Sequence, residues 1–142
     1  MRISFTGTRR GMSAYQERQF EDLIRFYFGR GLMNLFTHGA CVGADVQAHR
    51  IVRRIFGTSV MIGAFPSNHE TSRIEELRDD CNFVAAEKPP LERDRDVVDA
   101  GKDLLIAAPL QMLEARRSGT WTTVRYARRI GVKVEVMMRE RA

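Results

Sequence analysis

The sequence HGACVGAD at residues 38–45 decides the fold, because it joins a strand-like run to an amphipathic helix through two glycines. The run before it is MNLFT (33–37), and Ala48, Ile51 and Val52 follow at helical spacing. Similar turns occur at TGTRR (6–10) and SGT (118–120). In a parallel α/β sheet, such turns lie at the carboxyl edge, where helix N-termini present free N–H groups. We therefore expect three turns to meet at one edge and form a pocket for a phosphate-bearing ligand.

Strand-like and helix-like segments alternate along the whole chain. Strands are expected at 2–6, 33–37, 59–65, 103–108 and 132–138, and 83–86 is an ambiguous short strand. A capping box formed by Ser13 and Gln16 opens the first helix, and a second box, Ser67 with Glu70, predicts a polar helix through about Arg78. Further helices are expected before Gly57, at 91–100 and at 120–129. This order predicts one domain, residues 1–142, with a Rossmann-like α/β fold: a mostly parallel sheet with helices on both faces.

Composition narrows the class of protein. The chain has 142 residues, of which 44% are hydrophobic and 29% are charged, as expected for a soluble globular domain. No apolar run approaches the roughly 18 residues of a membrane span, and no leader peptide is visible, so we expect a cytoplasmic protein without a membrane partner. The net charge of +5 favours an anionic partner. Cys41 and Cys81 lack the spacing of a zinc site, so we expect no metal ion, and nothing indicates a cofactor.

The first two turns supply most of the candidate ligand-binding residues. Gly7 permits a tight turn, Thr8 offers a hydroxyl, and Arg9 is suited to pair with a phosphate. The alternative is a surface turn with solvated arginines. Gly39, Ala40 and Gly43 belong to a loop that brings backbone close to a ligand.

Two polar side chains follow these glycines at the start of the second helix. Asp45 is either an N-cap or an acceptor for a ribose hydroxyl, and it is also the best candidate for a catalytic carboxylate. His49 lies one turn later on the same face, where it either contacts the ligand or has a structural role.

The third turn is expected to bind an anion. Ser118, Gly119 and Thr120 combine hydroxyls with the N–H groups of a helix start. The alternative is that Ser118 only caps the helix. Trp121 is expected to pack in the core or to stack on a base.

These turns resemble motifs of a known superfamily. Residues 38–49 (HGACVGADVQAH) are similar to the G-x-x-x-G-x-D-x-x-A-H segment of the bacterial DNA-processing protein Smf/DprA, and 118–127 (SGTWTTVRYA) to its S-G-[ST]-x-x-T-[AV]-R-x-A segment. Residues 6–9 resemble its opening G-[ST]-R turn. The resemblance identifies the chain as a compact member of the SLOG superfamily, which joins Smf/DprA with the LONELY GUY phosphoribohydrolases. It implies a Rossmann-like fold that binds nucleotides, nucleotide-derived messengers or single-stranded nucleic acid, often as a homodimer.

The chain departs from the LONELY GUY enzymes in two ways: it lacks their paired glycines, where Arg116 and Arg117 stand, and it lacks their glutamate. Their P-G-G-x-G-T-x-x-E run carries a glutamate that takes part in N-glycosidic cleavage, and Thr123 stands at that position here. The sequence therefore favours a nucleotide-binding module. The alternatives are an enzyme that cleaves an N-glycosidic bond of a nucleotide, with Asp45 as its carboxylate, and a single-stranded DNA binder.

Overall fold

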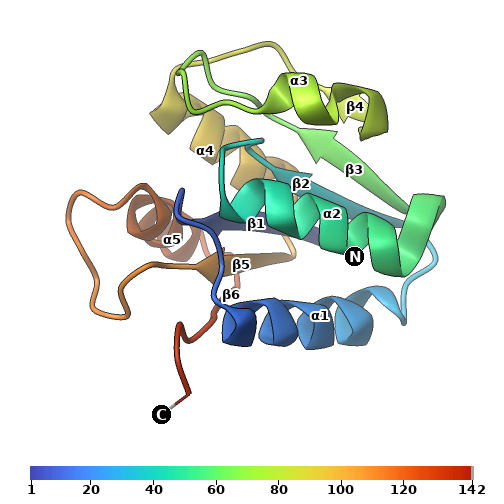
Figure 1. Ribbon diagram of the computed structural model, residues 1–142, viewed down its shortest axis with the longest axis horizontal. Coiled ribbons are helices and arrows are strands. Elements are labelled where there is room, and N and C mark those ends of the chain that lie inside the picture. Colours follow the sequence, from blue (N-terminus) through green and yellow to red (C-terminus); the bar gives the residue numbers. More distant parts are fainter. Residues whose placement is uncertain (142) are drawn as a thin grey trace.

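The computed structural model describes residues 1–141 and contains one parallel sheet in the order β4-β3-β2-β1-β5-β6 (Figure 1). The strands are β1 (Arg2–Gly7), β2 (Asn34–His38), β3 (Val60–Ala64), β4 (Phe83–Val84), β5 (Leu104–Ala108) and β6 (Val134–Val136). The helices are α1 (Ala14–Phe28), α2 (Ala44–Phe56), α3 (Ile74–Leu77), α4 (Pro90–Ala100) and α5 (Gly119–Arg129). The predicted α/β class and the short strand near residue 83 are confirmed.

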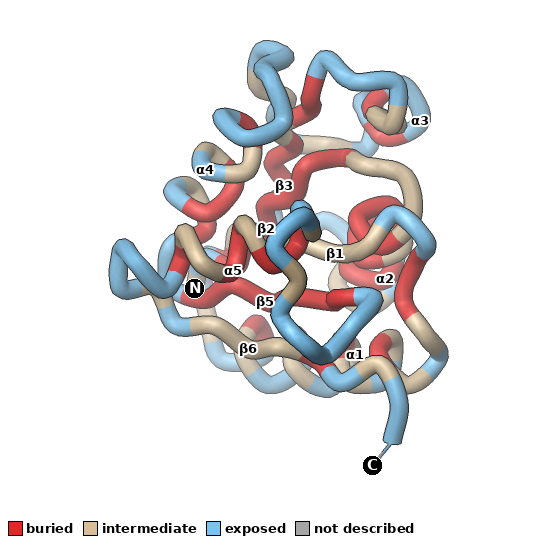
Figure 2. The backbone as a smooth tube through the Cα atoms, turned by 90° about the vertical axis from the view of Figure 1, so that its left-hand side faces the viewer, coloured by how far each residue is buried: buried red, intermediate tan, exposed pale blue. Residues whose placement is uncertain are grey.

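Two hydrophobic layers enclose the sheet. On one face, α1 and α2 pack on it, and the rings of Phe5 on β1 and Phe20 on α1 meet edge to face at 5.3 Å. On the other face, α4 and α5 contribute Val98 and Val124, which pack against Leu105 of β5. All five residues of β5 are buried, because helices cover the strand on both sides (Figure 2). The predicted placement of helices on both faces is confirmed.

The first predicted helix start is confirmed and the second is wrong. Gln16 N–H donates to Ser13 Oγ at 3.1 Å, and Ser13 N–H donates to the Gln16 side chain at 3.1 Å, which completes the capping box. Ser67 Oγ instead accepts from the N–H of His69, and α3 begins only at Ile74. Residues 67–72 stay irregular because their backbone pairs with other loops. Ser67 forms an isolated β-bridge with Lys88, and Ser72 forms one with Cys41.

The sheet order places a crevice at the carboxyl end of β1. This strand pairs with β2 on one side and with β5 on the other. The strands that follow β1 in the chain, β2 to β4, extend the sheet on one side of it, and β5 and β6 extend the sheet on the other side. Parallel α/β sheets bind ligands at such a switch point. Within residues 1–141, no helix has the length and apolar character needed to cross a membrane.

Candidate functional site

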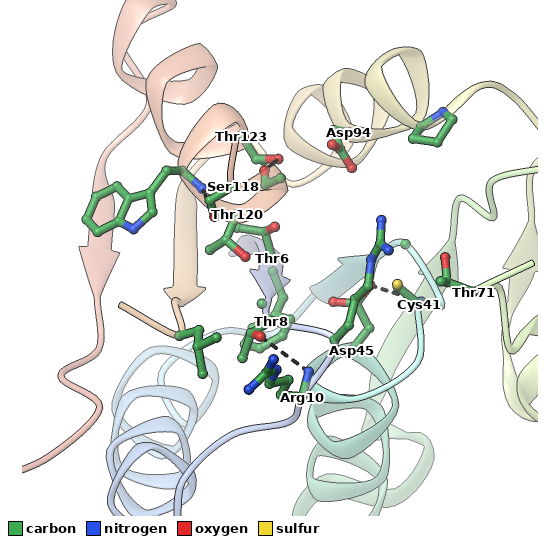
Figure 3. Close-up of a pocket in the computed structure, with 18 of the residues that line it drawn as sticks. Thr6, Thr8, Arg10, Cys41, Asp45, Thr71, Asp94, Ser118, Thr120 and Thr123 are labelled. Atoms are coloured by element: carbon green, nitrogen blue, oxygen red, sulfur yellow. Dashed lines mark hydrogen bonds between the residues drawn. The ribbon is translucent and has the colours of Figure 1, made fainter. Parts of the chain in front are cut away.

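A cavity of about 500 Å³ opens at this switch point (Figure 3), within the size range of small-ligand sites. It brings together most of the predicted ligand-binding residues, namely Gly7, Thr8, Arg9, Gly39, Asp45, Ser118, Gly119 and Thr120. Ala40, Gly43 and His49 are not part of its wall. The three turns therefore meet as predicted, and three of the chosen residues lie outside the wall.

Gly43 allows the first two turns to touch. Its φ is +94°, and a Cβ at this position would collide with the carbonyl of Arg9. The close approach lets the N–H of Ala44, the first residue of α2, donate to the carbonyl oxygen of Thr8 at 3.0 Å. Gly43 thus joins the β1 turn to the start of α2 without reaching the cavity.

Asp45 is the most unusual polar residue of the wall. Its side chain is buried, with 5% exposure. Oδ2 accepts the N–H of Cys41 at 3.1 Å, whereas Oδ1 is buried without a hydrogen-bond partner in residues 1–141. Burial raises the pKa of Asp45 to about 6, although the guanidinium of Arg93 opposes this rise. The N-cap of α2 is Gly43, so the capping interpretation of Asp45 is wrong.

Arg93 and Asp94 on α4 complete this wall, and the sequence motifs did not identify them. The side chain of Arg93 donates to Asp94 Oδ1 and to the carbonyl of Gly39, both at 2.7 Å. Burial raises the pKa of Asp94, while Arg93 and the Thr123 hydroxyl act in the opposite direction. Arg93 lies four residues before the buried Val97, on the helix face that packs on the sheet. That spacing is the pattern that could have revealed it.

Positively charged groups also line the cavity. Arg9, Arg10 and Arg117 line the cavity and are exposed. Helix α5 begins here, and its N-terminal end adds a partial positive charge. The cavity therefore combines arginines with two carboxyl groups, Asp45 and Asp94.

Ser118 and Trp121 hold the start of α5 in place. Ser118 Oγ accepts the N–H of Trp121 at 3.2 Å, so the capping role of Ser118 is confirmed. The indole packs in the core against Leu105, and its Nε1–H donates to the carbonyl of Gln111 at 2.9 Å. The predicted core packing of Trp121 is thereby confirmed, and the residue also lines the cavity.

His49 faces away from the cavity. Its Nδ1 lies 2.9 Å from Nε2 of His38, and its Nε2 lies 2.7 Å from the Asp80 carboxylate. The sequence predicted either a ligand contact or a structural role for His49. The structure does not bring the ring to the ligand cavity.

His38, His49 and Cys81 form the one compact group of potential metal ligands within residues 1–141, with donor atoms within 4.8 Å of one another. However, Nδ1 of His38 accepts the N–H of Ala40 at 2.9 Å, so the proton of this neutral ring is on Nε2. A protonated Nε2 has no lone pair for a metal. The hydrogen bonding therefore fits a buried polar network better than a metal centre.

No family model, curated protein or solved structure matches the chain.

Proposed function

We propose that the cavity binds a nucleotide or a nucleotide-derived molecule. The observation that carries the proposal is the buried carboxyl group of Asp45 in the cavity wall, whose Oδ1 has no hydrogen-bond partner within residues 1–141. A buried acceptor without a hydrogen bond costs free energy, so such atoms are rare, and water, an ion or a ligand satisfies most of them. A sugar hydroxyl or an amino group of a ligand supplies the missing donor.

The charged groups of the wall support a ligand that carries both an anionic group and hydrogen-bond donors. Arg9, Arg10 and the N-terminus of α5 suit a phosphate, while Asp45 and Asp94 suit hydrogen-bond donors of the ligand. A nucleotide combines phosphate, sugar hydroxyls and a base within one molecule of fitting size. The resemblance of residues 38–49 and 118–127 to SLOG proteins supports the same ligand class.

Thermal-shift measurements with nucleoside mono-, di- and triphosphates, NAD and ADP-ribose test the proposal. At least one of them is expected to raise the melting temperature, and inorganic phosphate alone is expected to raise it less. Asp45→Asn removes the effect, because its amide NH₂ replaces an acceptor with a donor. Asp79→Asn is the matched control, since Asp79 is exposed in the turn after α3. Equal stabilisation by phosphate and by every nucleotide contradicts nucleotide recognition.

A second candidate function is hydrolysis of an N-glycosidic bond. It is favoured by two carboxyl groups, Asp45 and Asp94, that share the cavity and both have raised pKa values. One carboxyl group in its acid form would give a proton to the departing base, and the other would activate a water for attack on the anomeric carbon. The products are the free base and the sugar phosphate.

Chromatography of the products separates the two functions. Release of free base from a nucleotide, lost in Asp45→Asn and reduced in Asp94→Asn, would establish the hydrolase. If bound nucleotide remains intact after prolonged incubation with wild-type protein, the cavity is a binding site only.

A further inference from the structure

A chain of hydrogen bonds runs from the cavity loop to the protein surface. The N–H of Ala40 donates to Nδ1 of His38, and Nε2 of His38 pairs with Nδ1 of His49 at 2.9 Å. Nε2 of His49 then pairs with the carboxylate of Asp80 at 2.7 Å. Both rings are buried, with 0% and 1% exposure, whereas the Asp80 side chain is 58% exposed. The network therefore connects a surface carboxylate to the back of the ligand site.

The partners fix the tautomer of each ring. His38 must keep Nδ1 unprotonated to accept from Ala40, so its proton is on Nε2 and points at His49. His49 consequently accepts at Nδ1 and carries its proton on Nε2, which donates to Asp80. Burial lowers the pKa of both rings, and the charge of Arg93 adds to this effect for His38. For His49 the carboxylate of Asp80 opposes the lowering of the pKa, while Arg53 and Arg50 add to it. Both imidazoles are neutral, and every ring nitrogen has a partner.

The network holds a strained turn. Ala40 has a φ of +54°, and it is the only non-glycine residue with positive φ among residues 1–141. This conformation disfavours an L-residue and persists only where its surroundings enforce it. The N–H of Ala40 is held by His38, and its carbonyl accepts the N–H of Arg73 at 2.7 Å.

The strained turn sets the environment of the carboxylate that faces the ligand. On either side of Ala40, the carbonyl of Gly39 holds Arg93 and the N–H of Cys41 donates to Asp45 Oδ2. From this placement we propose that His49 and Asp80 are positioning residues: through His38 they hold the Ala40 turn, and the turn orients Asp45 and Arg93. The contacts above support the positioning of Asp45. The expected effect of His49 and Asp80 on nucleotide affinity rests on the proposed nucleotide site.

Histidine-selective ¹⁵N NMR tests the tautomers directly. At pH 7.5, His38 and His49 are both expected to carry their proton on Nε2 and to lack the signature of a charged ring. A proton on Nδ1 of either ring, or a charged imidazole, overturns the proposed hydrogen-bond chain.

Variants of Asp80 test whether the network acts on Asp45. Asp80→Ala removes the acceptor for His49, Asp80→Asn keeps an acceptor oxygen, and Asp79→Ala is the exposed neighbour control. In Asp80→Ala, the carboxyl ¹³C resonance of Asp45 is expected to titrate at a pH higher by about 0.5, because the N–H of Cys41 no longer favours the charged form. Asp80→Asn restores the wild-type titration. Unchanged titration of Asp45 in folded Asp80→Ala overturns the proposal.

Affinity is the second measurement, made with whichever nucleotide stabilises the wild-type protein most. Asp80→Ala is expected to weaken its binding about 3- to 10-fold, the effect of losing one hydrogen bond that orients the site. Wild-type affinity in Asp80→Ala contradicts the positioning role. If no nucleotide binds the wild-type protein, the proposed function fails, and the NMR titration still decides whether Asp80 positions Asp45.

Discussion

Replacing Asp45 with asparagine is expected to stabilise the empty protein at neutral pH while it abolishes ligand binding. The pKa of Asp45 rises from 3.8 in the unfolded chain to about 6 in the fold. Between these two values only the native state holds the proton, so the stability contributed by Asp45 falls as the pH rises through this window. Above pH 6 the full penalty of burying the charge remains, about 3 kcal/mol. The introduced amide avoids that penalty but leaves its own NH₂ without a partner, which reduces the expected gain to about 1–2 kcal/mol.

Urea denaturation at pH 4.5 and pH 7.5 measures this effect, with Asp79→Asn as the control. The stability advantage of Asp45→Asn is expected to grow by about 2 kcal/mol between the two pH values. Because burial lowers the pKa of His38 and His49, protonation of these residues in the unfolded chain reduces stability below about pH 6.5. Both proteins share this opposite trend, so their difference isolates Asp45. The reasoning is refuted if the variant is less stable than wild type at pH 7.5, or if the difference is the same at both pH values.

Three further predictions concern the backbone, the loop and the charge. Gly43→Ala is expected to lower the free energy of unfolding, measured with urea, by about 2–4 kcal/mol, and the control Gly131→Ala by about 1 kcal/mol. Both glycines have positive φ, but only at Gly43 would a Cβ collide with backbone. Equal losses in the two variants would contradict the close approach at Gly43. Trp121→Phe removes the hydrogen bond to Gln111, so we expect a loss of about 1 kcal/mol and faster tryptic cleavage of the 109–118 loop; unchanged cleavage would show that the indole does not hold the loop. Single-stranded oligonucleotides, followed by fluorescence anisotropy, are expected to bind only well below about 0.15 M salt. In Arg9→Ala, the slope of the logarithm of affinity against the logarithm of salt concentration is expected to decrease by the amount of about one phosphate contact. Binding that survives about 0.15 M salt and weakens in this variant would favour the DNA-binding alternative.

Local sequence patterns predicted most of the strands and helices, because the spacing of apolar side chains differs between a strand and a helix. The capping box of Ser13 and Gln16 places the start of α1 correctly, since both partners lie within one turn. The same pattern at Ser67 and Glu70 fails, because residues 67–72 pair with loops that are distant in sequence. A capping motif predicts a helix only where no tertiary partner competes for the backbone.

The sequence by itself determined the parallel α/β order and the meeting of three glycine turns, because the connection between each strand and helix is local. Only the tertiary structure decided what the neighbouring side chains do. It brought Arg93 and Asp94 from α4 into the wall and turned His49 toward Asp80. Among residues 1–141 it left Oδ1 of Asp45 without a hydrogen-bond partner. These outcomes depend on which helix faces meet across the sheet, and residues far apart in the chain supply the partners.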